Sequence, residues 1–205
     1  MQSNMNRHGD GDPTGKAIGF LELRGAAFGV TALDEAVKAA PIDILQAKVV
    51  CPAKFIVILA GEVAAIQVAV AAAKTSVGSG LYDDLVLGRI HPDLYRGLYD
   101  QFHTIRQDSG ILGGKGATLA KEGEAFGVVE TLSMACGLAS ADKALKTASV
   151  KLRELRLGYA LGGRSYFVVA GATSQVQEAL TGAVEVATHW GSLGGHSLIL
   201  RPTAP

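Results

Sequence analysis

Cys51 is the residue with the most distinctive chemistry in this chain. It stands beside Pro52 between two short apolar runs, in the stretch KVVCPAKFIVILAG at residues 48–61. This pattern predicts a strand, a tight loop and a second strand, with a thiol at the loop tip. Soft thiolates suit zinc, copper(I) and iron–sulfur clusters, but one thiol cannot chelate a metal alone. Taken alone, a solitary cysteine is more often a small buried hydrophobe than a ligand.

The second cysteine, Cys136, falls in a predicted helix, and we expect it to be a core residue. Two cysteines make no disulfide framework, and they favour a reducing cytoplasm. An enzyme that used Cys51 as a nucleophile would need a base held nearby. The 5 histidines are scattered along the chain and form no recognisable dyad motif. We therefore do not expect an enzyme.

The composition also argues against several classes of partner. The 19 basic and 19 acidic residues cancel, which leaves no electrostatic footprint for nucleic acid or an anionic membrane. The longest apolar stretch, residues 55–73, is interrupted by Gly61, Glu62 and Gln67, whereas a spanning helix needs about 20 mostly apolar residues. Charged residues make up only 19%, below the usual value of about 25%. We expect no nucleic acid and no membrane partner, but assembly with other protein chains.

The chain contains two copies of one pattern. AIGFLELRGAAFGVTALDEAVKAA begins at Ala17, and AFGVVETLSMACGLASADKALKTA begins at Ala125, an offset of 108 residues. Glu22 and Lys38 of the first copy align with Glu130 and Lys146 of the second. A repeat of this length indicates a duplicated domain rather than a short-repeat solenoid. We divide the chain into a leader (1–15), a first domain (16–96), a polar, Gly-rich linker (97–116) and a second domain (117–205).

Each copy is predicted to run strand, helix, strand, strand, helix, strand. This order is the ferredoxin-like βαββαβ plan, an α+β fold with both helices on one face of a sheet. The uncovered face needs a partner copy or a partner subunit. In the first helix, Val30, Leu33 and Val37 share one side, and in the second Val63, Ile66, Val70 and Val77 do. The predicted ranges in the first copy are 17–23, 26–40, 44–50, 55–60, 62–76 and 85–90.

The two copies resemble bacterial microcompartment (BMC) shell domains in tandem, the trimer-forming class often called BMC-T. The blocks AIGFLELRG, DEAVKAA, FIVILAGEVAAIQVAV and RIHP carry the resemblance in the first copy. AFGVVET, ADKALKTA, LGGRSYFVVAG and LRP carry it in the second. The resemblance covers nearly all residues from 17 to 202. It implies a structural shell protein in the bacterial cytoplasm, with other shell proteins as partners.

The resemblance further implies a pseudohexameric homotrimer with six domains around one pore. VVCPAKF resembles the tandem shell proteins of propanediol-utilisation compartments, in which three symmetry-related thiolates hold an iron–sulfur cluster. By this likeness, Cys51 of each subunit binds one [4Fe–4S] cluster per trimer, for electron transfer across the shell. Three cysteines would leave the fourth iron to another ligand, since such clusters usually take four. The pore-lining residues would be Val50, Pro52, Ala53, Tyr159, Ala160, Leu161, Gly162 and Gly163.

Lys38, Lys146 and Arg201 occupy positions that lie at tile edges in this family. Each lysine also comes near the end of a predicted helix, where a cation is favourable in any protein. Two alternatives to the cluster-bearing tile stay open. The same tile could have an open pore that conducts small metabolites, or the chain could be a soluble ferredoxin-like regulator that binds a ligand between subunits.

Overall fold

The computed structural model describes residues 16–103, 124–158, 161–200 and 202. It contains two four-stranded antiparallel sheets, with strand orders β2-β3-β1-β4 and β6-β7-β5-β8. The elements of the first domain are β1 (Ala17–Leu23), α1 (Ala26–Ala39), β2 (Asp43–Val50), β3 (Lys54–Gly61), α2 (Val63–Val77), the 3₁₀ turn η1 (Gly78–Gly80) and β4 (Leu81–Leu87). Those of the second are β5 (Ala125–Thr131), α4 (Met134–Thr147), β6 (Lys151–Leu157), β7 (Ser165–Gly171), α5 (Thr173–His189) and β8 (Leu193–Ile199).

Both domains thus have the predicted βαββαβ order and an α+β fold. The last strand of the first copy begins four residues earlier than predicted, at Leu81, because Asp83 and Asp84 pair with β1 despite their charge. Asp84 bonds Lys74 of α2, and Asp83 accepts a hydrogen bond from Ser133 of the second domain. Both carboxylates therefore have partners on neighbouring elements, Asp84 on α2 and Asp83 in the second domain.

A helix that the sequence analysis did not predict, α3 (Pro92–His103), follows the first domain and crosses the boundary placed at residue 96. Pro92 opens it, where the missing N–H costs nothing. The backbone N–H of Asp93 donates to His91 Nδ1, and Leu94 and Leu98 are fully buried. The remaining linker residues, 104–116, lie outside the described part of the chain.

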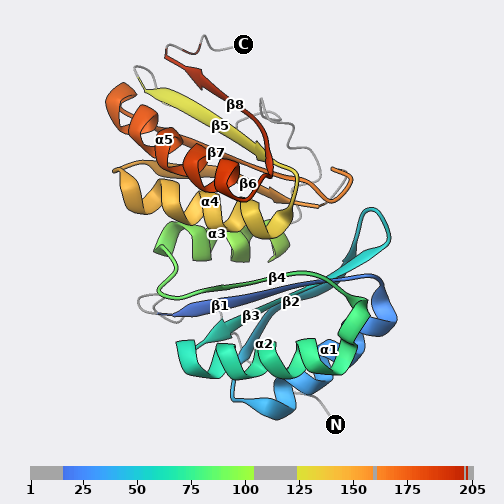
Figure 1. Cartoon of the computed structure of the whole chain (residues 1–205). Helices are drawn as coiled ribbons and strands as arrows, with labels where there is room; N and C mark the ends of the chain where they lie inside the picture. Colours follow the sequence, from blue (N-terminus) through green and yellow to red (C-terminus); the bar gives the residue numbers. More distant parts are fainter. Residues whose placement is uncertain (1–15, 104–123, 159–160, 201, 203–205) are drawn as a thin grey trace.

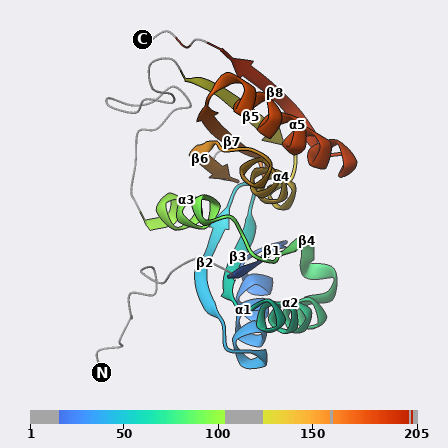
Figure 2. The same ribbon diagram turned by 90° about the vertical axis from the view of Figure 1, so that its left-hand side faces the viewer.

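The two domains stack in four layers, with α3 and α4 between the two sheets (Figures 1 and 2). One face of the first sheet, with Leu21, Val57 and Leu59, packs on α1 and α2. The opposite face, with Phe20 and Ile58, joins residues of α3, α4 and the second sheet in one core. The second domain therefore covers the face that a single copy leaves open, as the sequence analysis required of a partner.

The helix α1 follows the prediction only in part, because Leu33 packs against the first core but the two valines do not. Its buried residues are Gly29, Ala32 and Ala36, whereas Val30 and Val37 are 62% and 46% exposed. These small residues face the domain's own sheet, and their size lets the helix lie close to it. The valines point away from that sheet and are exposed in the single chain.

The apolar side of α2 is placed as predicted, with Ile66, Val70 and Val77 buried in the first core. By length and composition alone, residues 63–80 are apolar enough to cross a membrane, but 33% of this stretch is buried inside the protein. Packing of α2 on its own sheet accounts for its composition.

We expect Gly29→Ala to lower the urea midpoint of unfolding. A Cβ on Gly29 would lie 2.1 Å from Cδ1 and 2.4 Å from Cγ of buried Phe55. Alanine gains about 1 kcal/mol of helix propensity, but overpacking a core usually costs about 1–3 kcal/mol and this contact is severe. Gly195→Ala is the control, because a Cβ there has nothing within 4 Å. Equal midpoints for the two variants would contradict the packing described.

Candidate functional site

The hairpin between β2 and β3 carries Cys51 at its tip. Val50 pairs with Lys54, so the turn consists of Cys51, Pro52 and Ala53. The Cys51–Pro52 peptide is cis, and Ala53 has φ 52°, in the left-handed region. Cys51 is exposed. The hairpin extends beyond the body of its sheet (Figure 1), so its thiol is available to groups outside the chain.

The equivalent loop of the second domain, between β6 and β7, lies against this hairpin. A Cβ built on Gly163 would lie 3.7 Å from Pro52 Cδ, and one on Gly158 would lie 3.3 Å from Val50 Cβ. Gly162 and Gly163 have φ of 61° and 84°, a conformation that glycine adopts at little cost. The structure therefore brings together Val50, Pro52 and Gly163 from the predicted pore-lining set.

The other predicted loop residues are placed less fully. Leu161 is partly buried and packs against a small apolar cluster on the second sheet, and its carbonyl accepts a hydrogen bond from Arg164 N at 3.1 Å. Tyr159 and Ala160 lie outside the described residues.

A buried ion pair stands at the base of the Cys51 hairpin. Lys54 Nζ bonds Glu22 Oε1, and the exposed fractions of the two side chains are 15% and 1%. Lys54 Nζ also lies 3.3 Å from the ring centroid of Tyr82, a cation–π contact. Burial raises the pKa of Glu22, and nearby Asp83 raises it further, although Lys54 opposes the rise. The second oxygen of Glu22 is buried and has no hydrogen-bond partner among the residues that the structure describes.

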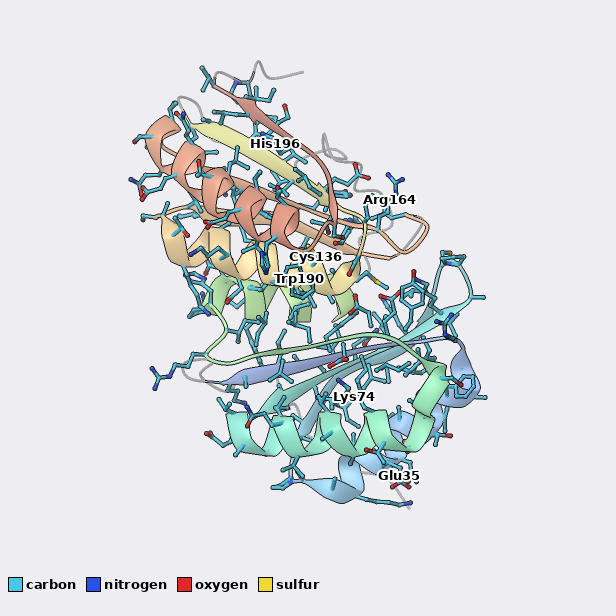
Figure 3. The ribbon with its side chains drawn as sticks, in the orientation of Figure 1. Glu35, Lys74, Cys136, Arg164, Trp190 and His196 are labelled. Carbon is cyan, nitrogen blue, oxygen red and sulfur yellow. The ribbon has the colours of Figure 1, made fainter. Side chains whose placement is uncertain are left out.

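The second domain has a matching pair in a different environment. Arg164 Nη1 bonds Glu130 Oε1 at 3.1 Å, with exposed fractions of 54% and 45%. Glu22 and Glu130 stand opposite Ile56 and Tyr166, two residues after Lys54 and Arg164 respectively. Arg164 lies at the loop end of the second domain (Figure 3). The two pairs are thus equivalent by repeat, but only the first is covered by another domain.

Glu22 and Glu130 were not predicted as a site from the sequence. The available signal was an acid at the same position of both copies, within a strand that is otherwise apolar in the first copy and apolar except for Thr131 in the second. A buried acid in such a strand needs a partner, and the cation after each loop supplies it.

No three His, Cys, Asp or Glu side chains lie close enough to hold a metal ion in the part of the chain that the structure describes. Cys136 has no exposed surface, burial raises the pKa of its thiol, and its Sγ lies 3.7 Å from Ser140 Oγ. Cys136 is therefore a core residue, as predicted. An iron–sulfur cluster would need Cys51 from several chains, and the exposed tip position of Cys51 fits such sharing.

The predicted tile-edge lysines have partners on their own helices. Lys38 bonds Asp34, and Lys146 bonds Asp142. Asp142 Oδ1 also accepts a hydrogen bond from the backbone N–H of His91 at 2.8 Å, which ties the end of the first domain to α4. Arg201 lies outside the described residues. A role for these residues between tiles stays a prediction.

Comparisons with known proteins agree with this architecture. The family model of the BMC domain matches residues 17–90 and 125–202. The chain is 36% identical over 187 residues to the bacterial microcompartment shell protein PduT of Citrobacter freundii, covering 91% of this chain and 93% of PduT.

Two solved structures are similar. A microcompartment protein from Desulfitobacterium hafniense DCB is 34% identical, with a TM-score of 0.77, and the match covers 92% of this chain and 96% of that one. The fused permuted hexameric shell protein MSM0275 from the RMM microcompartment has a TM-score of 0.59 at 19% identity, covers 86% and 85% of the two chains, and shows the fold alone.

We expect Lys54→Met to destabilise the protein by about 3 kcal/mol, because it leaves the Glu22 carboxylate buried without its cation. Lys151→Met, which removes an exposed lysine at the far end of β6, should change stability by less than about 0.5 kcal/mol. The double variant Glu22→Leu/Lys54→Met should recover most of the loss, since apolar residues can replace a buried pair. Urea unfolding measures all three. Independent, additive effects of the two substitutions would show that the pair is not coupled.

Proposed function

The chain belongs to the family of BMC-domain shell proteins of bacterial microcompartments, and we propose that three copies close into a ring of six domains around a central pore. The protein is a structural component of the shell, which lies in the bacterial cytoplasm. The trimer and the chemistry of its pore are the proposal. One observation carries the ring. The contact between the two domains joins a sheet face of the first domain to a helix of the second, which are two different surfaces. Each domain therefore has one of these two surfaces left without a partner in a single chain.

In the contact within the chain, α4 of the second domain packs on the open face of the first sheet. Leu138 and Leu145 of α4 are 0% and 4% exposed in this contact. Their counterparts by repeat, Val30 and Val37 on α1, are 62% and 46% exposed. The helix α1 therefore presents the same kind of apolar side as α4, with no second sheet over it in one chain.

The matching unused sheet face is in the second domain. Its apolar residues Phe126, Tyr166, Val168 and Ala170 lie on the side of the sheet away from α4 and α5. Among the described elements, no helix covers this side (Figure 2). Placing α1 of a neighbouring subunit there repeats the contact found within the chain. A head-to-tail contact of this kind closes into a ring when its rotation divides a full turn.

The loops identify the part of each domain that faces the ring axis. In a ring of six equal units, adjacent equivalent points are as far apart as each is from the axis. Pro52 and Gly163 are nearly equivalent by repeat, and the Cβ position of Gly163 lies 3.7 Å from Pro52 Cδ. So short a separation argues that both hairpin tips, including Cys51, stand close to the axis.

We further propose that the three Cys51 thiolates hold one [4Fe–4S] cluster at this pore. Three-fold symmetry would supply three soft ligands to three irons, and the fourth iron would take another ligand. The exposed position of the thiol at the hairpin tip supports this assignment. When bound, such a cluster supplies one-electron transfer, which would pass across the shell.

We expect Val30→Asp to abolish the trimer. A buried, unpaired carboxylate at this contact costs at least about 2 kcal/mol per interface. Val68→Asp is the matched control, because Val68 is 51% exposed on α2 and its counterpart by repeat, Glu178, is already an acid. Light scattering after size exclusion should give three times the 21.2 kDa chain mass for the native protein and the control. A native monomer, or a trimeric Val30→Asp variant, would contradict the ring.

We expect protein purified without oxygen to be brown and to hold close to four irons per trimer. Cys51→Ser should lose the iron and the colour but keep the trimer mass, whereas Cys136→Ala should keep all three. Metal analysis and absorbance spectra measure this. A trimer that stays colourless and iron-free after anaerobic reconstitution would refute the cluster and favour an open pore for small metabolites.

A further inference from the structure

The N-terminus of α4 bonds to the first domain through a hydroxyl and a carboxylate. Ser133 Oγ donates a hydrogen bond to Asp83 Oδ2 at 2.7 Å, and the same oxygen accepts one from the backbone N–H of Cys136 at 3.3 Å. The other carboxylate oxygen of Asp83 accepts from the backbone N–H of Asp84 at 2.9 Å. Negative charge is favourable at this end of a helix. The contact between the domains therefore includes a directional polar contact beside its apolar core.

Asp83 needs this donor because another acid stands next to it. It lies opposite Glu22 in the register of β4 with β1, so both carboxylates are on the sheet face that α4 covers. Like charges at directly opposed positions repel, and the charge of Asp83 adds to burial in raising the pKa of Glu22. The ammonium group of Lys54 pairs with Glu22, whereas Ser133 of the second domain bonds Asp83. A helix placed on this face without a hydroxyl at its N-cap would leave Asp83 covered and without that donor.

The corresponding positions of the proposed contact between chains carry no such pair. At the offset of 108 residues, Ser133 aligns with Gly25, which is the N-cap of α1 and makes no side-chain cap bond. Asp83 aligns with Gly195, which lies opposite Glu130 in the register of β8 with β5. A Cβ on Gly195 has nothing within 4 Å in the single chain. Placing α1 of one chain on the second sheet of another therefore brings glycine to glycine, where the contact within the chain brings a hydroxyl to a carboxylate.

The two pairings that the ring does not use are mismatched. If α1 of another copy covered the first sheet, Gly25 would offer no hydroxyl, and Asp83 would be covered without a donor. A charged acceptor left without its donor costs more free energy than the bond contributes when it is made. If α4 of another copy covered the second sheet, Ser133 would meet Gly195, and only a hydroxyl would lose its acceptor. The first sheet therefore discriminates between the two helices more strongly than the second sheet does.

We propose that Asp83 and Ser133 determine which helix the first sheet accepts, and that they thereby fix the alternating order of domains. This role rests on the proposed ring, because the helix that the first sheet rejects is α1 of a second copy. The second sheet, with Gly195 in the place of the acid, accepts α1, whose N-cap is Gly25 and whose apolar side carries exposed Val30. A penalty on the wrong pairing gives specificity without new attraction in the right one. Chains then join only head to tail.

The contact between chains is tested by adding the acid to the second sheet. We expect Gly195→Asp to raise the dissociation constant of the trimer about tenfold or more, because the new carboxylate meets only Gly25 of the next chain. Gly195→Ala is the control and should leave the constant unchanged. In chains that carry Gly25→Ser, where φ is 150° and any side chain is strained, Gly195→Asp should raise the constant no more than about twofold. Sedimentation across a dilution series measures each protein.

The contact within the chain is tested by the reverse substitutions. Ser133→Gly should lower the urea midpoint of unfolding in the native chain, because Asp83 loses its donor although glycine itself is tolerated at an N-cap. In the Asp83→Gly chain, the same substitution should change the midpoint little, since the acid that needs the donor is gone. Equal effects of Ser133→Gly in the two chains would show that this hydrogen bond selects no helix, and would overturn the proposed role.

Mass and affinity separate the failure of this role from the failure of the ring. A native chain with the mass of a monomer would overturn the ring and with it the order of its domains. A native trimer that Gly195→Asp leaves as stable as Gly195→Ala does would overturn the role of Asp83 and Ser133 alone. Should Gly195→Asp fail to fold, the two Ser133→Gly measurements decide.

Discussion

The packing of the first sheet on the helices of the second domain is the contact on which the rest of this structure depends. It buries Phe20 and Ile58 on one side and Leu138 and Leu145 on the other in one continuous core. A four-stranded sheet with helices on one face leaves the other face apolar, and that face must be covered. The chain meets this requirement once internally, through its own second copy. The exposed valines of α1 and the uncovered face of the second sheet leave the same kind of contact unused at both ends of the chain, and the proposed ring would use it.

The position of the loops follows from this contact. Because the two domains are related by one packing operation, their equivalent hairpins come together at one end of the stack, with Pro52 beside Gly163. Glu22 and Lys54 lie at the same end and are buried by the same contact. The cost of burying a carboxylate there is offset by an ammonium group that also lies over the ring of Tyr82. Loop placement and local charge are therefore consequences of a single interface, and the proposed assembly would repeat that interface.

Much of the fold follows from the sequence because each strand and helix is predicted independently in the two aligned copies. Alternating and continuous apolar runs identified the strands around the Cys51 hairpin, and the residues buried in α2 follow its apolar period. The side of α1 that faces its own sheet did not follow, since Gly29, Ala32 and Ala36 are small and the valines are more apolar. Periodicity reports that a helix has an apolar side, but it does not say which of two partners that side meets.

Other features could not be read from the sequence for equally physical reasons. The helix α3 has polar residues and a central glycine, and its burial depends on α4 and β6 of the other domain, far away in the chain. The Glu22–Lys54 pair joins residues 32 positions apart, so only the cross-strand register reveals it. Cys51 could be proposed as a candidate ligand from its loop sequence. The residues that lie beside its hairpin, Gly158 and Gly163, come from the second domain and could not be identified that way.

The most direct measurement of the central claim is an experimental structure of the assembled protein by electron cryomicroscopy or crystallography. The account predicts a three-fold ring in which α1 of each subunit lies on the Phe126 and Val168 face of the next, with the three Cys51 sulfur atoms facing one another across the axis. A ring with residue 51 at its outer rim, or an assembly in which α1 faces solvent, would contradict it.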